Sequence, residues 1–509
     1  MMEKCRSALM AFSALLVLAA GLVLWPAEAR CEDGAGTTTA DDKADGKTAP
    51  PPAPTKPAGW KFGGSLRARV EMWDWFNPGT PAVGKQNEYA FFAGYLRLTA
   101  LHTSRRADIF AEVSVPVLAG LPTDATAPAP QGQLGLGAAY RAANGDRAAY
   151  IFVRQASVTF KGVGGESSNL KLGRFEFIEG QESLTQDATL DWIKRERIAH
   201  RLIGNFAFSH VQRTADGAQY SYNSRGTNVT LVAARPTTGV FELNGNKEVS
   251  DVEYVYAGVT HTGASKKYDA RLFYIFYRDD RGLIPTDNRP LAQRKLDVAS
   301  LNISTVGGHY ARKMGNADLL GWGAWQMGDW GGLSQRSWSY VAELGYQLPR
   351  VPWKPWFRAG TDRSSGDHDP NDRRHQTFFQ ILPTPRIYAR FPFYNMMNLE
   401  DSFAELILRP HPRVTLRSGY RWLRLSQSAD LWYSGGGAFQ SSTFGFSGRP
   451  SFGSRNLGDL VDISVDFKAA SKTMLTFYYG HAKGGNIVHS IYPAGTASNL
   501  AYWEISQRF

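Results

Sequence analysis

The feature that most constrains this chain is an alternation of apolar and polar residues that continues for more than ten positions at a time. A period of two is typical of a β-strand whose two faces meet different surroundings. Residues 60–76 illustrate it, with Phe62, Gly64, Leu66, Ala68, Val70 and Met72 on one face and Lys61, Ser65, Arg67, Arg69 and Glu71 on the other. Strands of soluble sandwiches are mostly ~5–6 residues long, whereas a strand that crosses a bilayer needs ~9–11. The pattern therefore favours membrane-spanning strands.

The same pattern recurs along the chain and predicts about 18 strands. The predicted strands span residues 60–76, 88–103, 106–118, 149–161, 168–177, 214–225, 226–237, 251–262, 266–279, 294–310, 316–328, 336–347, 353–363, 398–409, 411–426, 457–469, 471–483 and 499–509. An even number of alternating strands of this length is typical of a bacterial outer-membrane barrel. We therefore predict an all-β fold, a transmembrane antiparallel β-barrel.

The links between the predicted strands alternate in length. The links after the second, fourth and later even-numbered strands are tight, such as Ser224-Arg225-Gly226 and Pro410-His411-Pro412. Most of the others are long, namely 119–148, 178–213, 364–397 and 427–456. Outer-membrane barrels have short periplasmic turns and long extracellular loops, which matches this asymmetry. We expect any gate to lie in the long outer loops, such as 119–148 or 364–397.

The first residues fit a secretory signal peptide. Lys4 and Arg6 form a basic region, an apolar stretch follows over residues 8–24, and Ala27-Glu28-Ala29 fits a small-x-small cleavage site. Two alternatives are a membrane anchor and a lipoprotein signal. The apolar stretch is short for an anchor, and the residues before Cys31 lack the small apolar pattern of a lipoprotein signal. We therefore expect cleavage and export.

Three regions follow from these observations. Residues 1–29 are expected to be the signal peptide. Residues 30–59 are rich in Pro, Ala, Thr and Asp, cannot build a core, and are predicted to form a disordered periplasmic linker. Residues 60–509 are predicted to form the outer-membrane barrel.

The last predicted strand carries two further signals. Tyr502 and Trp503 suit an aromatic girdle at the membrane interface. Phe509 ends an alternating strand, which resembles the signal read by the outer-membrane assembly machinery. We therefore expect that machinery and outer-membrane lipid to be partners of the chain.

The formal net charge of +11 favours an anionic partner. We expect no nucleic-acid partner, because the charges are scattered singly along strands. A barrel of this size can hold an aqueous channel, and arginine keeps its charge and grips carboxylates bidentately. The arginines predicted to face this lumen are Arg67, Arg69, Arg97, Arg154, Arg174, Arg417 and Arg421. Such a set would select anions; the alternative is that each is an ordinary wall residue paired with Asp or Glu.

Motifs of enzymes and of cofactor sites are missing from the sequence. Gly445-Phe446-Ser447-Gly448 lacks the final spacing of a hydrolase nucleophile elbow, and no His-Glu-x-x-His, phosphate loop or paired-Cys spacing occurs. Asp367, Asp369 and Asp372 lie together but lack a bidentate Glu at the spacing a Ca²⁺ loop needs, which favours a solvated loop. We therefore predict no catalytic residue, no cofactor and no metal site, and hence no enzyme.

Several segments occur in a characteristic order. They are Leu170-Lys171-Leu172-Gly173-Arg174-Phe175, Arg213-Thr214-Ala215-Asp216-Gly217, Ala233-Ala234-Arg235-Pro236, Asn395-Met396-Met397-Asn398-Leu399, Asp430-Leu431-Trp432-Tyr433 leading into Gly435-Gly436-Gly437-Ala438, and Gly458-Asp459-Leu460-Val461-Asp462-Ile463 followed by Tyr479-Gly480-His481. As an ordered set they resemble the alginate export family, large barrels that pass polyuronate across the outer membrane.

The resemblance implies an 18-stranded barrel with an arginine-rich constriction. Four charged residues match family positions, which implies that they line the path of the solute. These are Arg97, Arg154, Arg174 and Asp216. Two departures from the family pattern concern neighbouring positions: Phe175 replaces the usual Gln, and Ala215 replaces the Phe before Asp-Gly. Both changes are expected to reshape the lining of the pore.

These expectations combine into an outer-membrane porin of a Gram-negative bacterium that conducts an anionic solute, an exported acidic polysaccharide of alginate type. Any driving force would come from elsewhere, such as a periplasmic synthesis or export complex, because no nucleotide-binding motif is present. The alternative is a passive, anion-selective uptake porin for small anions or organic acids. A third interpretation is an enzyme-bearing barrel such as a lipid hydrolase, which requires a Ser–His pair near the membrane rim, and His200 with Ser209 or His489 with Ser490 would be the candidates. A structural or adhesive barrel with a plugged lumen is a fourth.

Overall fold

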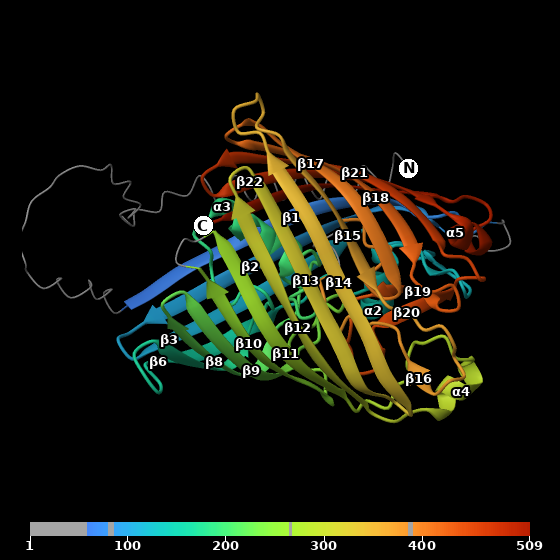
Figure 1. The fold of residues 1–509 in the computed structure, drawn as a ribbon, viewed down its shortest axis with the longest axis horizontal. Coiled ribbons are helices and arrows are strands. Elements are labelled where there is room, and N and C mark those ends of the chain that lie inside the picture. The colour runs from blue at the N-terminus through green and yellow to red at the C-terminus, as the bar shows by residue number, and fades with distance from the viewer. Residues whose placement is uncertain (1–58, 80–85, 264–266, 385–389) are drawn as a thin grey trace, which may run out of the picture.

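The computed structural model describes residues 59–79, 86–263, 267–384 and 390–509. The expected signal peptide and nearly all of the expected linker lie outside the described residues. The described chain forms a closed barrel of 18 antiparallel strands (Figure 1). The last strand pairs with the first, from Ser65 opposite Arg508 to Asp74 opposite Asn499, and this pairing closes the wall.

The strands of the wall follow one another in chain order, and each pairs with its neighbours in sequence. They are β1 (Gly59–Asp74), β2 (Glu88–Thr103), β3 (Ala107–Ala119), β6 (Phe152–Lys161), β7 (Ser168–Phe175), β8 (Ala215–Ser224), β9 (Thr227–Pro236), β10 (Val252–Thr262), β11 (Tyr268–Asp279), β12 (Leu301–Met314), β13 (Ala317–Trp330), β14 (Leu333–Gln347), β15 (Trp356–Ser364), β17 (Leu399–His411), β18 (Val414–Leu425), β21 (Asn456–Ala470), β22 (Thr473–Gly484) and β23 (Ala497–Arg508).

All the predicted strands are confirmed, in the predicted order. The largest difference in a boundary concerns β12, which was predicted to begin at residue 294 and begins at Leu301. Residues Leu291–Leu296 form the short helix α4 instead. The alternating pattern therefore located each strand and was least accurate where a helix adjoins it.

The long connections all lie at one end of the barrel, the end expected to face the outside, and several contain short elements. These are β4 (Thr126–Ala127), β5 (Gly132–Gln133), α2 (Leu136–Asn144), α3 (Ala188–Ile193), the π-helix η1 (Lys194–Ile198), α4, β16 (Arg374–His375), β19 (Leu431–Gly435), β20 (Phe446–Pro450) and α5 (Asn486–Ile491). One connection at this end is tight: Gly331 and Gly332 alone join β13 to β14. Among the described residues, no helix has both the length and the apolar character that crossing a membrane requires.

The two faces of the wall carry the two halves of the alternating pattern. Large apolar side chains such as Leu272 and Leu344 lie on the outer face and are 74% and 68% exposed. On the inner face, residues such as Ile275 are buried, because long loops fold into the barrel and pack there. Ile193, Leu202 and Leu382 of these loops are themselves fully buried. The interior is therefore a packed core of loops.

Candidate functional site

The loop of residues 176–214 leaves the extracellular end and crosses the lumen to the short-turn end. Its helix α3 and the preceding Asp187 reach the short-turn ends of β12, β14 and β15: the Thr189 hydroxyl accepts a hydrogen bond from Gln347 Nε2 at 2.9 Å, and Lys313 Nζ lies 3.0 Å from Asp187. The rings of Trp192 and Trp356 are 4.6 Å apart. Figure 1 shows α3 at the same end as the C-terminus. This loop therefore places a helix near the periplasmic mouth.

Buried ion pairs hold this loop to the inner wall. Arg197 Nη2 lies 2.8 Å from Glu343 of β14, and Arg201 Nη1 lies 3.0 Å from Asp362 of β15. Lys194 Nζ lies 3.1 Å from Asp269 of β11. Removing one member of such a buried pair leaves an uncompensated charge, which costs ~3–5 kcal/mol. The pairs therefore fix where the loop sits.

Three long loops meet at Arg213, which is buried. Its Nη1 donates to the Ala438 carbonyl at 3.1 Å, and its Nη2 donates to the carbonyls of Pro383 and Gly436 at 2.9 and 2.6 Å. Burial lowers the pKa of Arg213 to about 9. One guanidinium thus joins loop 176–214 to loops 365–398 and 426–455.

A polar cavity of about 120 Å³ lies between loop 176–214 and the inner wall of β17, β18 and β21. Its charged lining consists of Glu196, Arg197, Arg390, Glu405, Arg417, Arg421 and Asp462. Within the described part of the chain, Arg390 Nη1, Arg417 Nε and Glu405 Oε2 are buried without a hydrogen-bond partner. A lining of four guanidiniums and three carboxylates, with these three unpartnered atoms, suits water or a small anion in this space.

Glu196 of η1 forms an ion pair with one of these arginines, Arg417. Its Oε2 lies 2.8 Å from Arg417 Nη1, in an ion pair in which Arg417 is 18% and Glu196 is 34% exposed. Burial opposes ionisation of Glu196, but the guanidiniums of Arg417 and Arg390 outweigh it and lower the pKa of this carboxyl. The carboxylate of the loop therefore sits where a carboxylate ligand of Arg417 would sit.

Six of the eight residues predicted for the pathway lie on the inner face, and each has an acidic partner. Arg417 and Arg421 line the cavity, and Arg421 Nη1 lies 2.6 Å from Asp401. Near the closing seam, Arg69 Nη2 lies 2.5 Å from Glu504. Arg67 lies 3.9 Å from the same Glu504 and donates to the Ala207 carbonyl at 2.7 Å.

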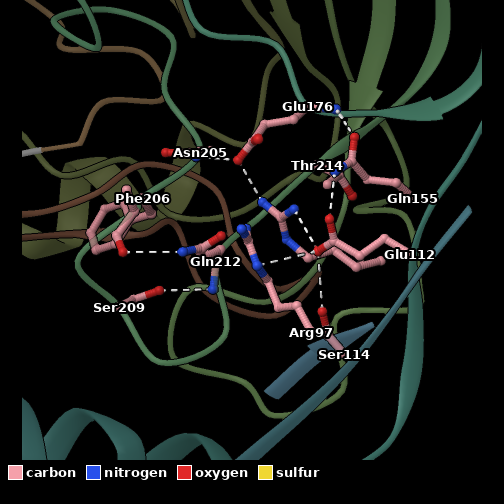
Figure 2. A network of polar contacts seen from close by, with 12 residues as sticks. Arg97, Glu112, Ser114, Gln155, Glu176, Asn205, Phe206, Ser209, Gln212 and Thr214 are labelled. Atoms are coloured by element: carbon pink, nitrogen blue, oxygen red, sulfur yellow. Dashed lines mark hydrogen bonds and ion pairs between the residues drawn. The ribbon is translucent and has the colours of Figure 1, made fainter. Parts of the chain in front are cut away.

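The remaining two of these six, Arg97 and Arg154, both contact Glu112. Figure 2 shows Arg97 beside Glu112 and Gln155. Arg154 Nη1 lies 3.0 Å from Glu112, and its Nη2 lies 2.5 Å from Glu176 at the start of loop 176–214. Arg97 Nε lies 3.8 Å from Glu112, and Gln155 Nε2 donates to Glu112 at 3.0 Å. The network thus ties β2, β3 and β6 to the loop.

Arg174 and Asp216 do not lie in the lumen, which corrects their expected position. They form a bidentate ion pair, with contacts of 2.7 and 2.6 Å. Asp216 lies opposite the exposed Arg235 of β9 in the strand register, and directly paired residues share a face. The alternation of β7 itself places Arg174 on the outer face with the exposed Leu172.

The two departures from the family pattern lie on the inner face. Phe175 and Ala215 are paired across β7 and β8, and both are buried in the packed interior. Their expected effect on the shape of the pore lining stays a prediction.

Five charged residues of the cavity were not predicted. Glu405 and Asp462 lie on the strands β17 and β21, and Glu196, Arg197 and Arg390 lie in loops, where no periodic pattern assigns a face. The only available signal was the charged run Lys194-Arg195-Glu196-Arg197 inside a long connection. The aspartates of the outer loop make turn contacts instead of one cluster: Asp369 and Asp372 accept hydrogen bonds from the backbone nitrogens of Asn371 and Arg374.

Comparisons with known proteins agree with this barrel. The family model described as alginate export matches residues 60–499. Among solved structures, OccK2 (OpdF) of Pseudomonas aeruginosa in complex with glucuronate is 10% identical with a TM-score of 0.51, and the match covers 88% of this chain and 98% of that one. A BenF-like porin of Pseudomonas fluorescens Pf-5 is 11% identical at the same TM-score and coverages. No curated protein matches the sequence. At these identities, the likeness to solved structures establishes the fold alone.

Proposed function

Because this chain belongs to the alginate export family and forms an outer-membrane β-barrel channel, we propose that it conducts an acidic polysaccharide of alginate type out of a Gram-negative cell. The lumen that we propose as its pathway is lined by Arg67, Arg69, Arg97, Arg154, Arg417 and Arg421. The observation that carries the proposal is the polar cavity, where Arg417 and Arg390 retain unpartnered nitrogens. A barrel with an arginine-lined lumen is most simply explained as a channel. We do not propose an enzymatic activity.

In this proposal the carboxylates of the polymer pass from one guanidinium to the next. Each arginine already has an acidic partner, such as Glu112, Glu504 or Asp401. These competing carboxylates keep each contact weak enough to release, which conduction requires. Loop 176–214 lies across the lumen, so it has to leave the periplasmic mouth before a polymer enters.

Single-channel recording with the barrel in a planar bilayer tests the proposal. We expect an anion-selective current that a polyuronate blocks, and weaker block in Arg417→Gln, because that guanidinium lines the cavity. Arg235→Gln is the matched control, since Arg235 lies on the outer face. Cation selectivity, or equal block of both variants, would contradict the arginine pathway.

An uptake porin for small anions or organic acids is the second candidate. Two observations favour it: the cavity of about 120 Å³ admits one small anion, and OccK2, of the same fold, was solved with glucuronate. An anion current that is indifferent to the polymer but is blocked by monomeric uronate would select this candidate.

The chain ends fit the same proposal. We propose that residues 1–29 are removed on export, that residues 30–59 form a periplasmic linker, and that residues 60–509 are the barrel. Phe509 hydrogen-bonds in both directions with Gly64, at 3.2 and 3.1 Å, and remains 46% exposed. We propose that the assembly machinery reads this residue and that a periplasmic export complex delivers the polymer.

A further inference from the structure

The extracellular rim carries a group of arginines on its outer face, over the strands from β14 to β21. We call it the rim arginine row, and its members are Arg336, Arg363, Arg374, Arg424 and Arg455. The strand register places three positions side by side at one level, because Arg363 lies opposite Glu400 and Glu400 lies opposite Arg424. Arg363, Glu400 and Arg424 are therefore adjacent across β15, β17 and β18.

The other members extend the row at both ends. Arg374 lies opposite the exposed Ser334 of β14 and so shares its outer face, next to Arg336. At the far end, Arg455 reaches Glu400 at 2.6 Å. Arg363 and Arg455 are 44% and 41% exposed, and Arg336, Arg374 and Arg424 are exposed as well. The guanidinium groups of the row are therefore accessible from outside the barrel.

The row is rich in positive charge relative to its acidic neighbours. Glu400 alone lies within the row and pairs with two arginines, Arg363 at 2.9 Å and Arg455. Asp459 lies one step nearer the membrane, opposite Trp422, and Asp372 caps the turn before Arg374. Asp329 of β13 is exposed and lies opposite Ser334, next to Arg336 and Arg374. Five guanidiniums thus face four carboxylates, so a net positive charge remains.

The opposite part of the rim provides an internal comparison. There, at the extracellular ends of β7 to β11, each outward arginine has an acidic partner. The pairs are Arg174 with Asp216, Arg235 with Glu248 and Glu253, and Arg278 with Asp280. Three guanidiniums face four carboxylates there. The excess of positive charge therefore belongs to one sector of the rim.

Aromatic side chains fix the level of the row relative to the membrane. Trp422 is 49% exposed on the outer face, two residues from Arg424 along β18, and the rings of Tyr420 and Trp422 are 4.5 Å apart. Trp338 and Tyr340 stack on β14 at 5.7 Å. Aromatic girdles mark the boundary between headgroups and hydrocarbon. Two residues along a strand span about 7 Å, so the row lies at the headgroup level of the outer leaflet.

We propose that the rim arginine row binds the phosphates of lipid A, the phosphorylated glycolipid of the outer leaflet. Guanidinium groups present paired N–H donors that match phosphate oxygens bidentately. The guanidinium of Arg363 lies 6.0 Å from the centre of the Trp338 ring, next to the aromatic belt. The bound glycolipid would anchor one sector of the barrel, independently of what the lumen conducts.

Lipid binding by the purified full-length barrel in detergent tests the proposal, with native mass spectrometry as the readout. The probes are bisphosphorylated lipid A, dephosphorylated lipid A and phosphatidylglycerol. Near a membrane surface each arginine contributes ~1 kcal/mol, about fivefold in affinity. We therefore expect the double variant Arg363→Gln/Arg424→Gln to bind bisphosphorylated lipid A about 25-fold more weakly. The matched control is Arg235→Gln/Arg278→Gln, at the same level on the balanced sector, and it should bind as the wild type does.

A second variant separates charge recognition from damage to the rim. Glu400→Gln removes the carboxylate inside the row and should tighten binding of lipid A, whereas a purely structural loss would weaken it. Equal loss in the row variant and in the control overturns the proposal. So does equal binding of dephosphorylated lipid A or of phosphatidylglycerol.

Discussion

At the scale of single residues, Asp367 and Asp430 form a junction between two outer loops. Asp430 Oδ2 accepts hydrogen bonds from the Asp367 backbone nitrogen at 2.9 Å and from the Thr377 hydroxyl at 2.6 Å. Both carboxyls are buried, and burial raises the pKa of Asp367 to about 7 and that of Asp430 to about 6. The other titratable groups close to Asp367 are His368, Asp369 and Asp372, so the junction is mostly acidic.

This junction predicts a pH dependence of definite sign. An unfolded Asp titrates near ~3.9, so the folded junction holds protons that the unfolded chain has already released. Its contribution to stability is complete below about pH 4 and is lost as the pH rises to about 7. We expect hydrogen exchange in residues 365–384 and 426–435, corrected for its intrinsic pH dependence, to be faster at pH 8 than at pH 5. Asp367→Asn should reduce this difference; an equal difference in the variant would contradict the assignment.

The face of the barrel wall on which a side chain lies could be predicted from the alternation of its own strand. Arg67 and Arg69 were placed correctly on the inner face by their apolar neighbours in β1. Arg174 was placed in the lumen as one of the set of arginines, and then by its match to a family motif, although Leu170 and Leu172 of the same strand point outward. In a strand of period two, local alternation is the stronger constraint, because one residue of shift reverses every side chain.

At the scale of elements, the strands were predictable and the loops were not. A strand in a barrel wall contacts lipid on one face and the lumen on the other, so apolar and polar residues alternate along its sequence. Loop 176–214 meets other loops and the inner wall on all sides, and it therefore carries no period. Its course was missed for that reason, and with it the roles of Glu196 and Arg197. The gate had been expected in loops 119–148 or 364–397.

The position of loop 176–214 predicts the effect of Glu196→Gln. A hydrogen bond to a charged partner contributes about 1.5–3 kcal/mol, so its loss should shift the balance between seated and released loop about tenfold or more. We expect longer open times in single-channel records and stronger block by polyuronate, because Arg417 becomes available to the polymer.

The same loop offers a matched control. Asp191 forms an ion pair with Arg195 within the loop, and Arg195 is 61% exposed. Exposed pairs of this kind contribute little, about 0–1 kcal/mol. Asp191→Asn should therefore leave the open times unchanged. If both variants opened alike, the contact between Glu196 and Arg417 would not be what holds the loop.

At the scale of the whole molecule, two features have opposite effects on the expected preference of the channel for anions. The net charge of +11 increases this preference, and the pairing of the inner arginines with carboxylates reduces it. Each carboxylate partner cancels part of the electrostatic potential of its arginine. We therefore expect anion selectivity to depend on the weak positive potential that remains in the lumen. Screening lengths fall from ~10 Å at 0.1 M salt to ~3 Å at 1 M. We expect anion preference, measured as a reversal potential, to be clear at 0.1 M KCl and nearly absent at 1 M KCl. A preference that persists at 1 M would point to direct binding as its source.

Arg213 has a consequence for how the two ends of the barrel communicate. Its hydrogen bonds link a loop that reaches the periplasmic mouth to two loops at the outer surface, and no strand of the wall takes part in them. Coupling between two sites is reciprocal in free energy. If a polymer displaces α3 from within, as proposed, we expect it to loosen the outer loops, and a ligand that holds the outer loops should resist the polymer by the same amount. The coupling between the two mouths would then run through the loops inside the barrel.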